Sequence, residues 1–146
     1  MSFDLKFTNK GTNPQGKARL EFTSNRNGSG QIDGNLYQYI ITTNAISTLS
    51  VNGKAADFSS KCNVVEFKFI PGVSGHTLST VTTIDSAAIM QIALDGAPSA
   101  SGGQKLGIQV NGSKGTGGVW FSSQWNGAST AQKVANNAAA DPIRVQ

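Results

Sequence analysis

The sequence predicts an all-β fold, an antiparallel β-sandwich of the Ig-like or jelly-roll-like type. Apolar and polar residues alternate with a period of two along several segments, which is the pattern of half-buried strands. Asn-Gly and Asp-Gly pairs, which favour the tight turns of β-hairpins, recur between these segments. Charged residues form only 14% of the chain, and the strand patterns follow one another without an intervening helical pattern, as in sandwich domains.

A single domain spanning residues 1–146 is expected from the length of 146 residues. At this size about two thirds of the surface of the unfolded chain can be buried, so a hydrophobic core forms without disulfides or a metal. The only cysteine is Cys62, which excludes an internal disulfide.

The predicted strands, in chain order, are 3–8, 17–23, 34–43, 46–51, 54–59, 63–70, 76–85, 89–94, 105–111, 118–122 and 143–146. The first two alternate strictly between apolar and polar residues. The third begins at the turn pair Asp33-Gly34, and the turn pair Asn52-Gly53 separates the fourth from the fifth.

The later strands rest on the same two signals. The sixth carries Val65, Phe67 and Phe69 in alternation with charged residues, and the ninth alternates until it meets the turn pair Asn111-Gly112. Segment 130–140 has alanines at helical spacing, but it would bury little as a helix, so a loop or frayed turn is expected. The side chains expected in the core are Phe7, Leu20, Phe22, Leu49, Val51, Val65, Phe67, Ile108 and Val110.

Charge and hydropathy exclude two classes of partner. The net charge of +4 comes from 12 basic and 8 acidic side chains, but the basic residues are scattered singly, whereas a phosphate-binding surface concentrates Lys and Arg. We therefore expect no nucleic-acid partner. The most apolar stretch is about half of the roughly 20 residues that cross a bilayer, so no membrane span is expected. The first residues also lack the apolar segment of a signal peptide.

The sequence contains no catalytic constellation, so we expect no enzyme activity, no cofactor and no metal site. His76 is the only histidine, which excludes a metal centre built from several histidines. Nucleophilic catalysis by Cys62 would need His76 and a third, orienting group at the same place. A packed structural thiol is the simpler interpretation of Cys62.

The most distinctive local feature is an aromatic cluster, Trp120-Phe121 with Trp125-Asn126. An exposed Trp beside amides and hydroxyls can stack on a sugar ring, whereas a Trp at a strand end usually plugs the end of a sandwich. Alternation predicts that Trp120 and Phe121 face opposite ways, which would bring at least one large aromatic side chain to the outer face. The candidate ligand-binding residues are therefore Trp120, Trp125 and Asn126.

Segment 46–58, ISTLSVNGKAADF, resembles the hairpin motif tSLtVnGntAtFsGtg of bacterial post-COAP-1-type domains. Other segments similar to motifs of that family follow in the same order: GKARLEF at 16–22, the pair Asp95-Gly96 with KLGIQV at 105–110, GGVWFSS at 117–123, and the tail 140–146 in the place of the closing strand. These domains are β-rich modules appended to large secreted and cell-surface proteins. The resemblance implies an accessory structural module and supplies no catalytic residue.

We therefore expect a non-catalytic extracellular or cell-surface module with a structural or adhesive role. Its partners would be proteins, either further copies of the chain or neighbouring domains, and exposed strand edges offer a route to self-assembly. The alternative is a carbohydrate-binding module that holds a polysaccharide with Trp120 and Trp125.

Overall fold

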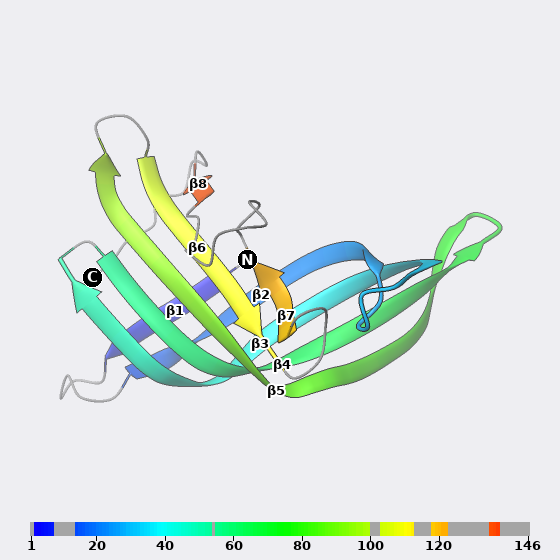
Figure 1. Cartoon of the computed structure of the whole chain (residues 1–146), viewed down its shortest axis with the longest axis horizontal. Coiled ribbons are helices and arrows are strands. Elements are labelled where there is room, and N and C mark those ends of the chain that lie inside the picture. The colour runs from blue at the N-terminus through cyan, green and yellow to red at the C-terminus, as the bar shows by residue number, and fades with distance from the viewer. Residues whose placement is uncertain are drawn as a thin grey trace.

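The computed structural model shows one eight-stranded antiparallel sheet in which β1 to β7 lie side by side in chain order, while β8 pairs with β6 (Figure 1). The structure describes residues 2–7, 14–53, 55–99, 103–112, 118–122 and 135–137. The strands are β1 (Ser2–Phe7), β2 (Pro14–Arg26), β3 (Ile32–Asn52), β4 (Ala55–Gly72), β5 (Gly75–Ser99), β6 (Gly103–Asn111), β7 (Val119–Ser122) and β8 (Ala135–Asn137).

The prediction of an antiparallel all-β chain is confirmed, because the strands hold more than half of the residues and every pairing is antiparallel. The described residues form a single sheet and show no second sheet packed on it, so the structure shows a β-sheet fold without showing a sandwich. Among the same residues, no helix has the length and apolarity that crossing a membrane would require.

Three of the predicted breaks between strands are wrong. The pairs of strands predicted on either side of 44–45, 60–62 and 86–88 are continuous in β3, β4 and β5, which have 21, 18 and 25 residues. The predicted breaks lie at or beside shifts of register, for example between Thr43 and Ala45 and between Cys62 and Val64. A β-bulge adds a residue to one strand, bends it and increases its twist. The lost alternation in the sequence therefore marks bends rather than turns.

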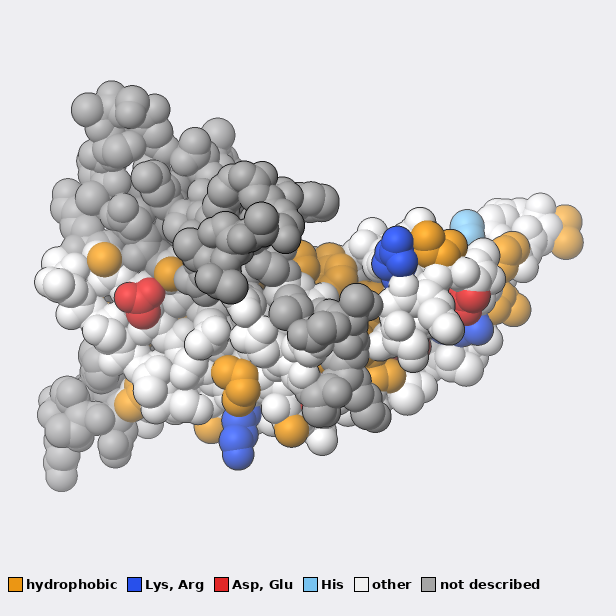
Figure 2. All heavy atoms as spheres, viewed as in Figure 1, with side chains coloured by type: hydrophobic (Ala, Val, Ile, Leu, Met, Phe, Trp, Pro, Cys, Tyr) orange, Lys and Arg blue, Asp and Glu red, His pale blue; other side chains and the backbone are white. Residues whose placement is uncertain are grey.

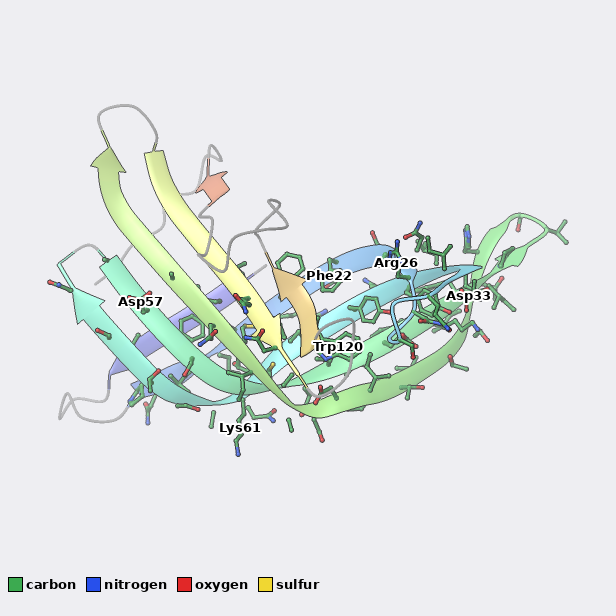
Figure 3. All side chains as sticks on the ribbon, viewed as in Figure 1. Phe22, Arg26, Asp33, Asp57, Lys61 and Trp120 are labelled. Atoms are coloured by element: carbon green, nitrogen blue, oxygen red, sulfur yellow. The ribbon has the colours of Figure 1, made fainter. Side chains whose placement is uncertain are left out.

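The shifts line up across the sheet and form one bend. Thr43 of β3 pairs with Cys62 of β4, which pairs with Ala88 of β5, and all three side chains are buried. Figure 1 shows the long strands curving upward on both sides of this line. Figure 3 shows Lys61 on the convex side of the bend, pointing away from the other strands.

The bend separates two halves of the sheet. The β2-side half consists of residues 19–26 of β2 with 32–43 of β3, 64–72 of β4 and 75–85 of β5, because β2 pairs with β3 only as far as Thr42. The β6-side half consists of β6 with the remaining parts of the same three strands, because β6 pairs with β5 only from Ile89 onward. In Figure 1 the hairpin of β4 and β5 projects alone at the end of the β2-side half.

The core lies on one face of the sheet and differs in part from the predicted core. Leu20, Ile108 and Val110 are buried as predicted, and Phe22 and Leu49 pack against the core while partly exposed. The remaining buried apolar side chains are Ala18, Tyr37, Tyr39, Ile41, Ala56, Phe58, Cys62, Val64, Ala88, Met90 and Ile92.

The largest error in the core prediction concerns β4. Ile41 pairs with Val64, so the buried face of β4 carries its even-numbered residues, whereas the predicted Val65 and Phe67 are half-buried on the opposite, outer face. Residues paired across strands share a face, so the buried face of β3 selects the even-numbered face of β4. Val51 is also wrong, since it is 39% exposed near the end of β3.

Three remaining predictions concern the ends of the chain. The side chain of Phe7 and the strand predicted at 143–146 lie outside what the structure describes. The loop expected at 130–140 contains the short β8, whose residue Ala135 pairs with Leu106 of β6.

Candidate functional site

Trp120 stands in β7 and packs on the core face of the sheet. Its ring centroid lies 6.1 Å from that of Tyr39, and the ring of Phe121 lies 5.0 Å from that of Phe22. Phe22 and Tyr39 pair across β2 and β3 on one face, so both aromatic residues of β7 pack toward the same face. The predicted opposite orientation is wrong, because the pairing of β6 with β7 is irregular at Asn111 and breaks the alternation.

A hydrogen bond fixes the indole of Trp120 in place. Its Nε1–H donates to Oδ2 of Asp85 over 3.1 Å, and Oδ1 of Asp85 accepts the backbone N–H of Ala87 over 2.9 Å. Asp85 is only 5% exposed, so these bonds compensate for the burial of its carboxyl group. Gly112 lies directly against the pair, and a Cβ atom there would collide with the Asp85 carboxyl and the indole.

Trp120 also borders an open hollow of about 370 Å³ on the β2-side half. Figure 3 shows Trp120 in the middle of the sheet, with Arg26 and Asp33 farther toward the projecting hairpin. The hollow is lined by Asn27, Gly28, Ser29, Asp33, Tyr37, Glu66, Lys68, Ile84 and Trp120. It therefore combines aromatic side chains with two carboxyl groups, one ammonium group and polar side chains from a turn.

Glu66 holds the turn 27–31 over the sheet. Its Oε2 accepts the backbone N–H of Gly28 over 2.7 Å, and the Tyr39 hydroxyl lies 2.9 Å from the same oxygen and 2.7 Å from the carbonyl of Arg26. Burial, assisted by the Glu66 carboxylate, raises the pKa of Tyr39 far above its usual range. The hydroxyl is therefore protonated at neutral pH and can donate to one of these two acceptors.

Asp33 and Tyr37 form a second hydrogen-bonded pair in the hollow. The Tyr37 hydroxyl donates to Oδ2 of Asp33 over 2.6 Å, and the Lys68 ammonium lies 3.9 Å from the same oxygen. The hydrogen bond from Tyr37 is the main reason why the pKa of Asp33 is lowered, and burial is the main reason why the pKa of Tyr37 is raised. The hollow thus presents an ionised carboxylate and a neutral phenol at neutral pH.

A second feature of the β2-side half is an open strand edge, which we call the β5 edge, residues 75–85. In the part of the chain that the structure describes, these residues pair with β4 alone, since β6 begins to pair at Ile89. Residues 70–83 are all exposed, and the large apolar side chains on them are Ile70, Val73, Leu78 and Val81. Figure 2 shows hydrophobic side chains gathered at this projecting end of the molecule.

The outer face of the β6-side half is polar by contrast. Thr48, Ser59, Gln91 and Gln109 pair across β3, β4, β5 and β6. They contribute to a shallow hollow of about 510 Å³ that Ser50 and the exposed Asp57 also line. Hydroxyl and amide groups on an exposed sheet face are well solvated by water, and these face solvent with one carboxylate and no cation among the lining residues.

Cys62 and His76 are not brought together. Cys62 is buried at the bend, whereas His76 pairs with Pro71 near the tip of the projecting hairpin. Burial, and to a smaller extent the charge of Asp85, raises the pKa of the Cys62 thiol to about 11, so the thiol is protonated at neutral pH and a poor nucleophile. No group of three or more potential metal-binding side chains gathers among the described residues.

Of the three candidate ligand-binding residues, the structure places only Trp120; Trp125 and Asn126 lie outside the described residues. The sequence pattern does not predict the polar partners of Trp120 in the hollow, because alternation places Glu66 and Lys68 on the solvent-facing side of their strand. The tyrosine pair Tyr37 and Tyr39, spaced for one face of β3, was the available signal. Comparison with protein-family models, curated proteins and solved structures finds no match to the chain.

Proposed function

We propose that this chain is a non-catalytic structural module that associates with other proteins, copies of itself included, through the β5 edge. The exposed and uncharged character of this edge carries the proposal. Between Gly75 and Ile84 there is no Lys, Arg, Asp, Glu or Pro. Proteins that remain monomeric usually protect an open edge with such residues, because its free N–H and C=O groups are a template for another strand.

Within the described parts of the chain, β2 forms a second open edge of the β2-side half, and it differs in this respect. β2 is free of β1 from Leu20 onward, and this stretch carries Glu21 and Arg26. Charges on an edge oppose the approach of a second strand, because pairing would strip water from them. The contrast indicates that the β5 edge is the side of the molecule open to a partner.

Two further parts of the proposal concern the setting of the chain and the outer face of β4. The extracellular or cell-surface setting follows from the resemblance of segment 46–58 to post-COAP-1-type domains. The apolar outer face of β4, which includes Val65 and Phe67, is the surface that a second sheet would cover in the expected sandwich.

Association through the β5 edge predicts that the weight-average mass of the purified chain rises with concentration in sedimentation and light-scattering experiments. Val81→Lys adds a charge to a side chain that is 52% exposed, so the fold is retained while edge pairing is opposed. We expect the association constant to fall by at least about tenfold, or about 1.4 kcal/mol.

Gln91→Lys is the matched control. It adds the same charge to an exposed position of β5 that has β4 on one side and β6 on the other. This control is expected to associate like the parent chain. A parent chain that stays monomeric at all concentrations, or two lysine variants that weaken association equally, would refute the role of the β5 edge.

A carbohydrate-binding module is the second candidate function, and the hollow beside Trp120 favours it. Sugar sites combine an aromatic ring with a few converging polar groups. Asp33, Glu66 and Lys68 supply such groups next to Trp120. Since the indole N–H already bonds to Asp85, Trp120 would contribute ring surface rather than a hydrogen bond.

A further inference from the structure

The two apolar side chains of the β5 edge share one face of the sheet. Val81 pairs with Phe67 and Leu78 pairs with Phe69, so both lie on the outer face with their partners in β4. A regular strand would place residues three positions apart on opposite faces. The register shift between Lys68 and Phe69 removes this offset, because it leaves an extra residue between Leu78 and Thr80.

We infer that two copies of the chain pair through their β5 edges in antiparallel orientation, with Leu78 of each copy opposite Val81 of the other. The inference rests on the proposed function and specifies its partner and register. A two-fold axis perpendicular to the sheet makes the strands antiparallel and keeps the outer faces of both copies on the same side. Each Leu78 side chain, 48% exposed, then meets a Val81 side chain that is 52% exposed.

This register also matches the faces of the two pairs that flank the Leu78–Val81 pair. Thr77 comes opposite Thr82, and both lie on the core face, because they pair with Ile70 and Glu66 of β4. His76 comes opposite Thr83, and both lie on the outer face. Ser79 and Thr80 of each copy come opposite Thr80 and Ser79 of the other, so the irregular parts of both strands meet at the two-fold axis. A shifted register would set a bulge against regular strand.

The pairing also joins apolar surfaces without bringing charges together. Phe67, Phe69, Leu78 and Val81 of both copies form one continuous apolar patch on the outer face, and the paired stretches contain no Lys, Arg, Asp or Glu. A two-fold contact closes on itself, which predicts a dimer. Pairing of the β5 edge with the β2 edge would instead repeat without closing and would bury Glu21 or Arg26 beside the new strand.

Disulfide trapping tests the register. Leu78→Cys and Val81→Cys are purified separately, mixed and oxidised mildly, with the buried Cys62 left in place. Opposite residues have Cβ atoms about 5 Å apart, close enough to bridge after a small adjustment. Two copies of the same variant place their cysteines about 10 Å apart along the strands, too far for a disulfide. We expect cross-linked dimer in the mixture, up to about half of all dimers by random pairing, and little in either variant alone.

Leu78→Cys mixed with Gln91→Cys measures random collision, because Gln91 lies away from the edge, between paired strands. Cross-linking of the Leu78 and Val81 variants no faster than this control would overturn the two-fold register. Cross-linking of one variant with itself that equals the cross-linking in the mixture would also overturn the two-fold register. If the parent chain nevertheless associates and Val81→Lys prevents it, the β5 edge still binds a partner and only the register is wrong. A parent chain that is strictly monomeric would overturn both the two-fold register and the role of the β5 edge.

Discussion

The bend at Thr43, Cys62 and Ala88 divides three long strands into halves with different surroundings. In the β6-side half, the edge of β5 is covered by β6, and the outer face carries Thr, Ser and Gln. In the β2-side half, no strand among the described residues covers the edge of β5, the outer face carries Val and Phe, and residues 70–83 are all exposed. The same strands thus have a covered edge and a polar outer face on one side of the bend. On the other side, the described residues leave the edge exposed and the outer face is apolar.

The difference shows where stability and association reside. Burial of apolar area and close packing supply most of the stability of a domain. Buried apolar side chains lie in both halves, for example Tyr37 and Ile41 in one and Met90 in the other, whereas residues 70–83 are all exposed. The projecting hairpin is held mainly by its own strand pairing, and a two-stranded ribbon alone is marginally stable. Its exposed apolar side chains add little to the fold of one chain and are available to a partner.

Truncating a side chain in each half of β5 tests this comparison with the largest expected effect. Met90 is fully buried in the β6-side half, so Met90→Ala should lower the free energy of unfolding by about 2 to 5 kcal/mol. Leu78 is 48% exposed, so Leu78→Ala should change it by no more than about 0.5 kcal/mol in dilute, monomeric protein. Urea unfolding followed by fluorescence measures both.

The comparison is wrong if Met90→Ala and Leu78→Ala lower the free energy of unfolding equally at low protein concentration. Leu78→Ala could instead lower the free energy of unfolding only as the protein concentration rises. This result would support the comparison, because it would show that Leu78 stabilises the chain through a second copy, as association adds to apparent stability by mass action.

The sequence predicts the all-β class of the fold well and the bend poorly, for one physical reason. Alternation is reliable where one face is buried and the other is solvated, as at Leu20, Ile108 and Val110. In the middle of β4 both faces are apolar, since Val64 is buried while Val65 and Phe67 are half-buried on the other side. Periodicity alone does not say which face meets the core there. The answer depends on pairing with Ile41 of β3, which is a long-range contact.

The candidate site was harder to predict than the fold. Trp120 was singled out as an aromatic residue, but its neighbours Asp33, Glu66 and Lys68 come from two other strands. Their meeting depends on the pairing of β3 with β4, in which Lys68 is opposite Tyr37. The bond from Gly28 to Glu66 holds the turn 27–31 beside them. The exposure of the β5 edge likewise depends on where β6 begins to pair.

A smaller effect is expected at the bend itself, from Cys62→Ser. The thiol is fully buried and packs as a small apolar group, so replacing it with a hydroxyl should cost on the order of 1 kcal/mol and leave association unchanged. Because burial raises the pKa of Cys62 to about 11, the thiol contributes stability that is complete below the pKa of an unfolded thiol and is lost as pH rises toward 11.

Unfolding measured between neutral pH and the folded-state pKa of Cys62 tests whether stability is lost as pH rises. The parent chain should lose more stability over that range than the serine variant, in which the thiol is absent. A serine variant that folds normally but no longer associates would show instead that the thiol has a role in binding.

The smallest effect is expected from Trp125→Ala, and it separates association from sugar binding. Edge pairing depends on backbone hydrogen bonds and on Leu78 and Val81, so loss of an aromatic side chain that does not belong to the β5 edge should leave the concentration dependence of light scattering unchanged. Sugar binding depends on a stacking platform. It predicts retention on insoluble polysaccharide that is abolished by Trp120→Ala or Trp125→Ala.

A further variant is needed because Trp120 also packs on Tyr39, so its loss could disturb folding. Lys68→Ala changes the hollow outside the core and therefore distinguishes lost sugar contacts from lost folding. A monomer that is retained on the polysaccharide and released by Lys68→Ala would make the hollow, and not the β5 edge, the functional surface.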